Sequence, residues 1–452
     1  MVSATVQKIS TLQSFTDRIT SREARVGIVG LGYVGLPLTL LFSAEKLRVT
    51  GFDIDRTKVD TLNAGNSYIW RIESEHIASA RAHGFTATDD FTAIAEMDAI
   101  LICVPTPLTE HHVPDLSYVQ ATIDAIAPHL HDGQLLVLES TTYPGTTEEI
   151  IVTTIEKAGR RVLRGTDLED ELNGIMVAFS PEREDPGNME TPRREVPKVI
   201  GGCDVRATAA AEALYQSIFT QTVAVSSPAA AEMTKLLENI YRAVNIAMVN
   251  EMKQLCMRMG IDIWEVINAA ATKPFGFQAF YPGPGIGGHC IPVDPFYLTW
   301  KAQEYGFPTR FIQLAGEINE QMPTFVMRQV ARALNFRGIA TKGAKVLVLG
   351  VAYKRDVDDL RESPSLTIIE LLQGLDVEVS YNDPFFPTVG HGRKYDLHMT
   401  SVPLDDLSIY DCVLIATDHS AYDYDRIVEE SKLVVDTRNA TRGIVSDKII
   451  RC

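Results

Sequence analysis

The segment from Arg25 to Asp53 constrains the fold of this 452-residue chain more than any other segment. A β-branched run, Val26-Gly27-Ile28-Val29, leads directly into Gly30-Leu31-Gly32-Tyr33-Val34-Gly35, and a helix-like stretch and a second run follow before Asp53. In such a unit the glycines permit a tight turn, close approach of a pyrophosphate and close helix packing, and the acid bonds the ribose of NAD. The alternative is a glycine turn of purely structural use. We expect the cofactor NAD at this turn, bound by Gly30, Gly32, Tyr33, Val34, Gly35 and Asp53.

The alternation of β-branched runs and helix-like stretches occurs in two separate parts of the chain. Runs at 99–103, 135–138 and 176–179 continue the first series, and runs at 345–349, 377–379, 412–415 and 433–435 form a second. Buried runs separated by helices are typical of parallel sheets covered on both faces. We therefore predict an α/β fold with two Rossmann-like doubly wound domains joined by a long central helix. The expected divisions are a helical leader at 1–24, an NAD-binding domain at 25–225, a central helical dimerisation domain at 226–329 and a second Rossmann-like domain at 330–452.

The central helix is predicted from its two ends. Ser227 is a good N-cap, Pro228 suits the first helical position, and no helix breaker follows until Gly260. Its roughly 32 residues would span about 48 Å. Its apolar stripe is wide enough to pack on the flanking domains or on a second copy, and consists of Met233, Leu236, Leu237, Ile240, Tyr241, Val244, Ala247 and Met248. We expect a homodimer or higher homo-oligomer. A second short amphipathic helix is expected in the leader from the spacing of Val6, Ile9, Leu12 and Phe15.

Composition excludes several classes of function. The formal charge of -17 argues against binding to nucleic acid or to an anionic membrane, because those partners select basic surfaces. The six cysteines lack CxxC spacing, so neither a metal site nor a disulfide framework is predicted. The sequence contains no apolar run of membrane-spanning length and no signal-like leader. We expect a cytoplasmic protein.

One cysteine stands apart from the other five. Cys290 lies in Gly287-Gly288-His289-Cys290-Ile291-Pro292-Val293-Asp294, where glycines remove bulk around the thiol and a carboxylate follows four residues later. The usual role of a lone cysteine is inert packing, which suits the others. An enzyme that oxidises an alcohol beyond the aldehyde to an acid needs to hold the aldehyde covalently, and a thiol can do so as a thiohemiacetal. We interpret Cys290 as a nucleophile.

Polar residues elsewhere have less specific patterns. On the central helix, Lys235 and Asn239 share a face with Glu232, so they can donate hydrogen bonds to a developing oxyanion; a solvated polar face is the alternative. Three loops follow strands at 104–107, 139–145 and 180–183, where ligands bind in open α/β sheets, although each loop could equally be a turn. These loops contribute Thr106 and Thr141 as candidate cofactor-binding residues and Glu182 and Arg183 as candidate substrate-binding residues.

Seven motifs together resemble the UDP-glucose/GDP-mannose dehydrogenase superfamily. In chain order they are GLGYVGLPL, CVPTPL, ESTTYPGTT, SPERxxPG, AExxKLLEN, GGHCIPxDP and GVAYKRDVDDLRESP. The resemblance, which extends from about Arg25 to Asn439, implies Cys290 as nucleophile, Lys235 and Asn239 as hydrogen-bond donors, and Asp294, Glu182 and Thr141 as the residues that order water. It also implies a UDP-sugar site closed by the last domain. The substrate-binding residues it implies are Glu182, Arg183, Lys235, Asn239, Tyr281, Gly287, Lys354 and Arg361.

Within the superfamily, the segment from Tyr281 to Lys301 most resembles the bacterial UDP-N-acetylglucosamine 6-dehydrogenases of polysaccharide pathways. This resemblance implies a four-electron oxidation of the C6 alcohol of that sugar, in the synthesis of precursors for capsule or O-antigen. UDP-N-acetylmannosamine, UDP-N-acetylgalactosamine and UDP-glucose are the alternative substrates. In other members of the superfamily a basic residue upstream of the cysteine loop reaches a neighbouring subunit's substrate, and Lys273 is the one nearby candidate for that role.

Two other functions fit the same fold. An ordinary two-electron hydroxyacid or 6-phosphogluconate-type dehydrogenase has a Rossmann domain and a long helical segment but needs no cysteine. A non-catalytic NAD-sensing protein would need neither Cys290 nor its polar neighbours. The number of NADH molecules formed per substrate separates these functions.

Overall fold

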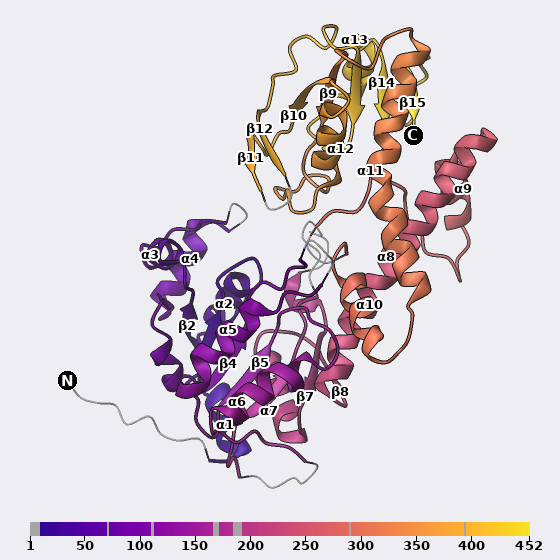
Figure 1. Cartoon of the computed structure of the whole chain (residues 1–452). Helices are drawn as coiled ribbons and strands as arrows, with labels where there is room; N and C mark the ends of the chain where they lie inside the picture. The colour runs from indigo at the N-terminus through magenta and orange to yellow at the C-terminus, as the bar shows by residue number, and fades with distance from the viewer. Residues whose placement is uncertain are drawn as a thin grey trace. The chain divides into compact units, whose positions relative to one another are not determined.

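The computed structural model describes residues 10–69, 72–109, 113–165, 171–183, 192–288, 291–392 and 395–452. The chain divides into two compact units, an N-terminal unit of residues 1–237 and a C-terminal unit of residues 238–452 (Figure 1). Each unit contains one predominantly parallel sheet, as the alternation of strand-like and helix-like segments predicts.

The N-terminal unit has an eight-stranded sheet in the order β3-β2-β1-β4-β5-β6-β7-β8. Its strands are β1 (Arg25–Val29), β2 (Arg48–Phe52), β3 (Thr86–Thr88), β4 (Ala99–Ile102), β5 (Leu135–Leu138), β6 (Met176–Phe179), β7 (Lys198–Gly202) and β8 (Thr222–Val225). The strands β1 to β6 pair in parallel, whereas β7 runs antiparallel to β6 and parallel to β8. The two strands β7 and β8 extend the sheet beyond those that the sequence pattern predicts.

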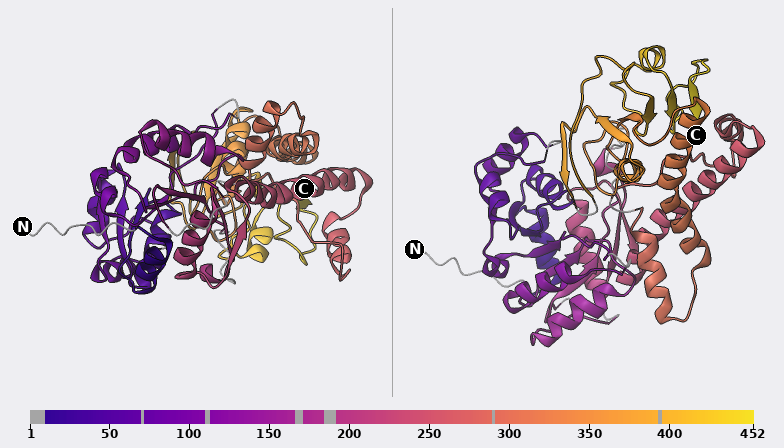
Figure 2. Two further views of the ribbon diagram at one scale, coloured as in Figure 1. Left: turned by 90° about the horizontal axis from the view of Figure 1, so that it is seen from below. Right: turned by 45° about the horizontal axis from the view of Figure 1, so that its top comes forward.

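Helices cover both faces of this sheet (Figure 1, Figure 2). The helices are α1 (Leu12–Thr20), α2 (Gly35–Ala44), α3 (Arg56–Asn63), α4 (Ser74–Ala82), α5 (Ser117–Ile126), α6 (Thr153–Lys157) and α7 (Val205–Gln216), with shorter turns η1 (Phe91–Glu96), η2 (Ala127–His129), η3 (Thr147–Val152) and η4 (Arg193–Glu195). Alternate residues of each strand face opposite ways: in β5, Leu135 and Val137 join the core beneath α1, α2 and α7, and Leu136 and Leu138 join the core beneath α5 and α6. The strands are therefore buried on both faces.

The N-terminal segment forms a short helix on this body. Thr11 caps α1, and Phe15 and Ile19 are buried in the core shared with α7. Leu12 packs at the edge of that core. Val6 and Ile9, which were expected on the same face, lie outside the described residues.

The long helix α8 (Pro228–Met259) has the bounds that its sequence predicts. The Ser227 hydroxyl accepts a hydrogen bond from the backbone N–H of Ala230, and Gly260 ends the helix at a φ of 71°. The predicted apolar stripe divides into two faces: Leu236, Ile240 and Ala247 are buried, whereas Met233, Leu237, Tyr241 and Met248 are exposed. Half of the stripe is thus used within the chain.

The C-terminal unit has a parallel sheet in the order β10-β9-β13-β14-β15 and a separate antiparallel pair, β11 and β12. The strands are β9 (Lys345–Leu349), β10 (Glu378–Asn382), β11 (Thr388–His391), β12 (Asp396–Thr400), β13 (Cys412–Ile415), β14 (Val434–Asp436) and β15 (Ile449–Arg451). The helices are α9 (Ile263–Ala271), α10 (Asp294–Glu304), α11 (Arg310–Phe336), α12 (Pro364–Gln373) and α13 (Tyr424–Glu430). α11 and α12 share the core on one face, and α13 packs on the other.

Polar contacts fix α8 against α11 within this unit. The amide of Asn250 donates to Asn319 at 3.0 Å, and Asn319 donates to the carbonyl of Ala243 at 3.0 Å. Asn250 also accepts from the backbone N–H of Gly283, so the helix pair holds the segment that leads toward Cys290. None of the helices described by the structure has the length and apolar character needed to cross a membrane.

Candidate active site

The glycine-rich turn after β1 has the geometry that a pyrophosphate site requires. Gly30 has a φ of 91°, and a Cβ on it would lie 2.7 Å from the carbonyl oxygen of Cys103. A Cβ on Gly35 would lie 2.0 Å from the carbonyl oxygen of Gly30, whereas one on Gly32 would meet no atom of the described chain within 4 Å. The outer two glycines are therefore needed for the turn and for packing, and Gly32 leaves open backbone that a phosphate can approach.

The start of α2 and the end of β2 complete this site. Within the described residues no side chain caps α2 at Val34, so its first backbone N–H groups suit an anion. Tyr33 is 53% exposed beside them. Asp53 accepts from the N–H of Leu31 at 3.0 Å and from that of Asp55 at 2.9 Å, and its side chain remains 8% exposed. The residues present fit NAD, with a backbone cradle for the pyrophosphate and a carboxylate for the ribose.

The loops after β4 and β5 are joined by hydrogen bonds. Thr106 is 3% exposed and its hydroxyl donates to the carbonyl of Thr141 at 2.7 Å, and Ser140 donates to the carbonyl of Val104 at 2.7 Å. Glu232 of α8, which is fully buried, accepts from the N–H of Gly145 and from both the N–H and the hydroxyl of Thr147. Glu232 thus anchors the loop of Thr141 to the helix that carries Lys235.

Lys235 and Glu182 meet at the end of β6. The Lys235 Nζ donates to the backbone carbonyl of Glu182 at 2.5 Å, and only 5% of Lys235 is exposed. Arg183 donates to the carbonyl of Pro197 at 2.6 Å, which turns its guanidinium toward the chain beneath it. Lys235 is therefore a buried, positioned cation instead of part of a solvated helix face.

Asn239 and Asp294 form a second contact, within the C-terminal unit. Asn239 is 1% exposed and donates to the Asp294 carboxylate at 2.5 Å, and it accepts from Arg242. Asp294 is the first residue of α10, where the positive end of the helix dipole favours a carboxylate. Cys290 and His289 lie outside the described residues, and Asp294 follows Cys290 by four positions.

The residues before Cys290 lie against the loop that carries Lys354 and Arg361. The N–H of Gly288 donates to the carbonyl of Arg361 at 2.9 Å. A Cβ on Gly287 would lie 2.4 Å from the Cβ of Tyr353, so a larger residue does not fit there. Arg361 makes a two-armed contact with Asp359, and its side chain remains 38% exposed. Of the predicted substrate residues, Gly287, Lys354 and Arg361 are thereby placed in one region.

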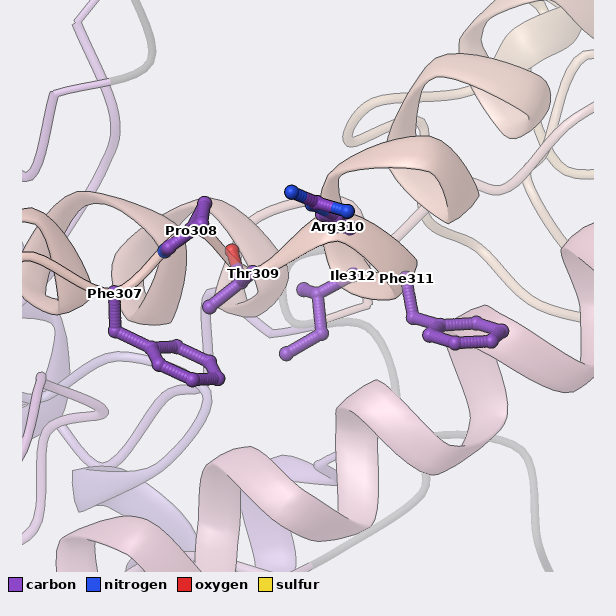
Figure 3. A pocket seen from close by; sticks show the side chains of 6 residues that line it. All are labelled: Phe307, Pro308, Thr309, Arg310, Phe311 and Ile312. Atoms are coloured by element: carbon purple, nitrogen blue, oxygen red, sulfur yellow. The ribbon is translucent and has the colours of Figure 1, made fainter.

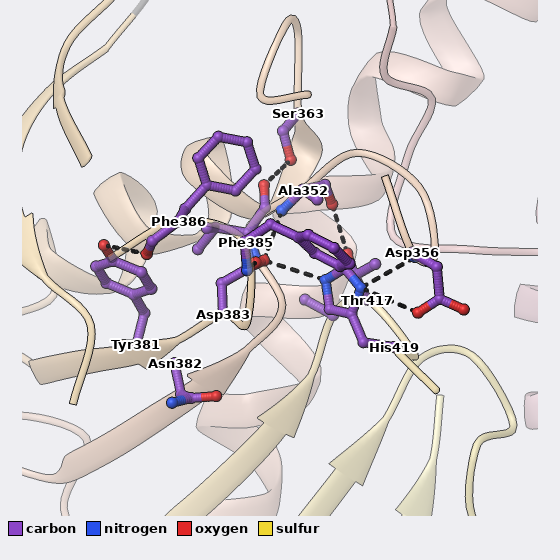
Figure 4. Close-up of polar contacts among 12 residues, drawn as sticks. Ala352, Asp356, Ser363, Tyr381, Asn382, Asp383, Phe385, Phe386, Thr417 and His419 are labelled. Carbon is purple, nitrogen blue, oxygen red and sulfur yellow. Dashed lines mark hydrogen bonds and ion pairs between the residues drawn. The ribbon is translucent and has the colours of Figure 1, made fainter. Parts of the chain in front are cut away.

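A buried carboxylate that the sequence did not single out supports the same loop. Asp383 accepts from the N–H groups of Val351 and Ala352 at 2.7 and 3.0 Å and from Nε2 of His419 at 3.1 Å. His419 Nδ1 accepts from the N–H of Asp356 at 3.0 Å, so the ring donates to Asp383 from Nε2 (Figure 4). The signal that would have identified Asp383 is its position directly after β10, which matches that of Asp53 after β2.

Two predicted residues and one surface hollow lie apart from these contacts. Tyr281 stacks on Trp264 of α9 at 5.4 Å between ring centroids and bonds Asn268, and Lys273 lies over the ring of Phe275. A hollow of about 440 Å³ is lined by residues 307–312 (Figure 3). Its Phe307 and Phe311 rings point to one side and Arg310 to the other. None of the predicted site residues lines it.

Comparison with known proteins decides the family. Three domains of the UDP-glucose/GDP-mannose dehydrogenase family match in order: the NAD binding domain over residues 24–219, the central domain over 229–321 and the UDP binding domain over 347–443. The chain belongs to the UDP-glucose/GDP-mannose dehydrogenase family. Its N-terminal domain binds NAD, and its substrate class is a UDP-sugar.

Relatives of this dehydrogenase are named for different sugars. It is 34% identical to a UDP-N-acetyl-D-glucosamine 6-dehydrogenase of Pseudomonas aeruginosa, over 89% of this chain and 92% of that protein. It is also 34% identical to an NDP-N-acetyl-D-galactosaminuronic acid dehydrogenase of Ralstonia nicotianae, over 91% and 95%. The solved structure of a UDP-D-ManNAc dehydrogenase from Pyrococcus horikoshii aligns with a TM-score of 0.83 at 31% identity, covering 94% of this chain and 97% of that one. The chain is therefore a nucleotide-sugar dehydrogenase of α/β fold.

Proposed function

We propose that this chain oxidises the C6 alcohol of UDP-N-acetylglucosamine to a carboxylate, with Cys290 as the covalent nucleophile. The observation that carries the proposal is the contact of Gly287 and Gly288 with the loop of Tyr353 and Arg361. It connects the segment directly before the thiol to the loop whose lysine and arginine suit a diphosphate. The Asn239–Asp294 pair belongs to the same unit and adds a polar group four residues after Cys290.

The chemistry follows from the oxidation level of the product. NAD, when bound, accepts the hydride in each of two oxidations. Loss of a hydride and a proton from the C6 alcohol gives an aldehyde, and the Cys290 thiolate adds to its carbonyl carbon to give a thiohemiacetal. Lys235 and Asn239, one turn apart on α8, donate hydrogen bonds to the oxygen on which negative charge develops.

The second half of the reaction removes the sugar from the enzyme. Loss of the second hydride from the thiohemiacetal carbon leaves a thioester on Cys290. Water, which Thr141, Glu182 and Asp294 orient, then adds to the thioester, and the carbon–sulfur bond breaks to give the carboxylate and the free thiol. Each sugar thus yields two NADH. The product is a UDP-N-acetylamino uronic acid, a precursor for capsule or O-antigen.

The choice of an N-acetylated sugar rests on the relatives and on one segment of sequence. The relatives compared above are named for N-acetylglucosamine, N-acetylgalactosaminuronic acid and ManNAc. The segment from Tyr281 to Lys301 is similar to the glucosamine branch. The corresponding mannosamine and galactosamine sugars are the second candidates, because each differs from UDP-N-acetylglucosamine in the direction of one substituent.

The substrate is tested by measuring NADH formation at limiting amounts of four sugars: UDP-N-acetylglucosamine, UDP-N-acetylgalactosamine, UDP-N-acetylmannosamine and UDP-glucose. We expect about two NADH per UDP-N-acetylglucosamine and a Cys290→Ser variant that does not complete the reaction. Cys256→Ser is a matched control, since Cys256 is 4% exposed within the core of α8 and α9. If the enzyme prefers another of the four sugars, that sugar is the substrate in place of UDP-N-acetylglucosamine. Formation of one NADH per sugar would overturn the thioester mechanism.

We also propose that the enzyme is a homodimer formed through the exposed face of α8. Large apolar residues line this face at helical spacing: Met233, Leu237, Tyr241, Met248, Met252, Leu255 and Met259, each 41% to 64% exposed. A continuous apolar stripe of this length favours burial by a second copy. Light scattering of a Leu237→Glu/Met248→Glu variant is expected to show a monomer where the native chain is a dimer. Unchanged mass in the variant would exclude this interface.

A further inference from the structure

A buried lysine lies between two carboxylates at the carboxyl ends of the first sheet. Lys198, the first residue of β7, is 2% exposed. Its Nζ lies 2.6 Å from Oε2 of Glu139 and 3.6 Å from Oε2 of Glu182, and it donates to the carbonyl of Pro181 at 3.1 Å. Sequence analysis assigned no role to Lys198 or Glu139. The proposed mechanism uses Glu182 alone of these three residues.

The surroundings of Lys198 hold it in place. Glu139 is 1% exposed, and its other oxygen accepts a hydrogen bond from the Tyr215 hydroxyl. The Lys198 ammonium also lies 5.2 Å from the ring centroid of Tyr215 and 5.5 Å from that of Phe219. Burial of charged groups costs free energy, and replacing a buried ion pair by well-packed apolar residues often leaves a protein equally stable or more stable. A role in the reaction is therefore a better explanation of this pair than stability.

The pKa values of the two carboxylates that share the lysine are shifted in opposite directions. Burial alone would raise the pKa of Glu182, but the positive charges of Lys198, Arg193 and Lys235 hold it below its ordinary value. Burial raises the pKa of Glu139, and the charge of Glu182 adds to that increase. Burial opposes the charge of Lys198, but its two carboxylate neighbours raise its pKa. Neighbouring acids whose pKa values are pushed apart are a common feature of acid–base sites.

We propose that Lys198 is a positioning residue that keeps Glu182 ionised at the end of β6, and that Glu139 holds Lys198 for this purpose. The inference rests on the proposed function, because the role of Glu182 in orienting water belongs to that function. An ionised Glu182 can accept a proton from the water that attacks the thioester. Glu139, on the far side of the lysine, fixes the ammonium by a direct hydrogen bond.

Several other charged or titratable groups face this cluster. Among the described residues they are Cys103 after β4, Arg193 in η4, Tyr215 of α7 and Lys235 of α8. Burial raises the pKa of Cys103 and of Tyr215, so both are neutral where Glu182 titrates. The charges that act on Glu182 are therefore those of Lys198, Arg193, Lys235 and Glu139.

Substitutions of Lys198 and of Glu139 are expected to shift the pH dependence of kcat in opposite directions. Lys198→Met removes a positive charge, so the pKa of Glu182 rises and the acid limb of kcat moves to higher pH by about one unit or more. Glu139→Gln removes a negative charge, so the acid limb moves to lower pH. Lys198→Arg retains the charge and is expected to restore the native limb. A purely structural role would lower kcat in Lys198→Met without moving its pH midpoint, which would overturn the proposal.

Two further measurements keep the test decisive. If Lys198→Met does not fold, the Lys198→Met/Glu139→Gln variant can replace it, because it leaves neither partner as an unpaired buried charge. In this double variant the acid limb of kcat is expected to move to higher pH by less than in Lys198→Met. Carbon-13 NMR of glutamate-labelled protein, assigned with Glu182→Gln, reports the protonation of Glu182 without turnover. If the pH midpoint of the Glu182 resonance shifts in Lys198→Met, the inference is supported even when no UDP-sugar is oxidised. The lack of oxidation would then contradict only the proposed function. If the pH midpoint of this resonance is the same in Lys198→Met and in the native protein, the inference is contradicted and the proposed function is not.

Discussion

The turns that follow the first strand of each sheet are built alike but use their carboxylates differently. Gly30 after β1 and Gly350 after β9 have φ angles of 91° and 83°, and their N–H groups donate to the carbonyls of Phe52 and Asn382 at 2.8 and 2.9 Å. The next N–H of each turn donates to the acid that follows the second strand, Asp53 or Asp383. The correspondence extends residue by residue through the start of each turn.

The two turns differ in what else bonds the acid. The Asp53 side chain is 8% exposed and is also bonded by Lys58 Nζ at 3.5 Å. A carboxylate can accept about four hydrogen bonds, so a position remains for the ribose of NAD. The Asp383 side chain is fully buried and receives a further N–H from Ala352 and the imidazole of His419. α2 begins at Gly35, whereas α12 begins only at Pro364. The second acid is therefore bonded throughout by groups of its own unit, whereas the first retains a position that a ligand can use.

The largest expected effect is at the glycine of the second turn. A Cβ on Gly350 would lie 2.5 Å from both the Cβ and the carbonyl oxygen of Thr417, at a φ that L-residues rarely adopt. Gly350→Ala should lower the free energy of unfolding by about 3 kcal/mol in urea denaturation. Gly443→Ala is the matched control, because Gly443 has a φ of 84° and no described atom within 4 Å of its added Cβ. Equal losses in the two variants would show that the close approach to Thr417 does not matter.

The second effect is the loss of the carboxylate that supports the loop of Lys354 and Arg361. Asp383 accepts a fourth hydrogen bond from the N–H of Phe385 at 2.8 Å. In Asp383→Asn the side-chain amide would face some of these donors with its own N–H groups, at a cost of about 2 kcal/mol. Burial would raise the pKa of Asp383, but the hydrogen bond from His419 and the backbone donors hold it lower. The stabilisation is thus present above the ordinary aspartate pKa and is lost as pH falls through the lowered value. A stability difference between native and variant that grows toward acid pH would contradict this account.

Asp53→Asn is expected to change cofactor binding more than folding. Removal of the negative charge should weaken NAD by about tenfold and reduce the discrimination against NADP, because the acid no longer accepts from the ribose hydroxyls or repels the phosphate. Titration with each cofactor measures both effects, and urea denaturation serves as the control. A stability loss as large as that of Asp383→Asn, without a change in NAD affinity, would remove the difference between the two turns.

The smallest effect concerns His419, which is fully buried. His419→Gln retains a donor near Asp383 but loses the acceptor of the Asp356 N–H, so the free energy of unfolding should fall by roughly 1 kcal/mol. Nitrogen-15 NMR of the native protein should show the proton on Nε2. His398→Gln provides a control at an exposed histidine. A proton found on Nδ1 would contradict the arrangement around Asp383.

Much of this fold could be predicted because its elements have strong local signals. The runs at 99–103 and 135–138 are continuous apolar stretches, and Pro228 and Gly260 mark both ends of α8. The strands β3, β7, β8, β11, β12 and β15 are missing from the prediction. β7 begins with Lys198 and ends in two glycines, a composition that favours a loop and becomes a strand only through pairing with β6 and β8.

The candidate site could be predicted only where a motif identifies it. The pattern predicts a strand at 377–379, but β10 continues to Asn382, and the position of Asp383 directly after a strand was therefore not recognised. Lys198 and Glu139 are 59 residues apart in sequence, and no local pattern pairs them. Cys290, Lys235, Asn239, Asp294, Glu182 and Thr141 keep their predicted roles as proposals.

The most direct test of the central claim is peptide mass mapping of Glu182→Gln after a rapid quench with UDP-N-acetylglucosamine and NAD. Slow hydrolysis in this variant should leave a sugar acyl adduct on the peptide that contains Cys290, released by hydroxylamine as a thioester is. Two results together would contradict covalent catalysis by Cys290. The Cys290→Ser variant would form the carboxylate as fast as the native enzyme, and the Glu182→Gln variant would carry no adduct on the peptide that contains Cys290.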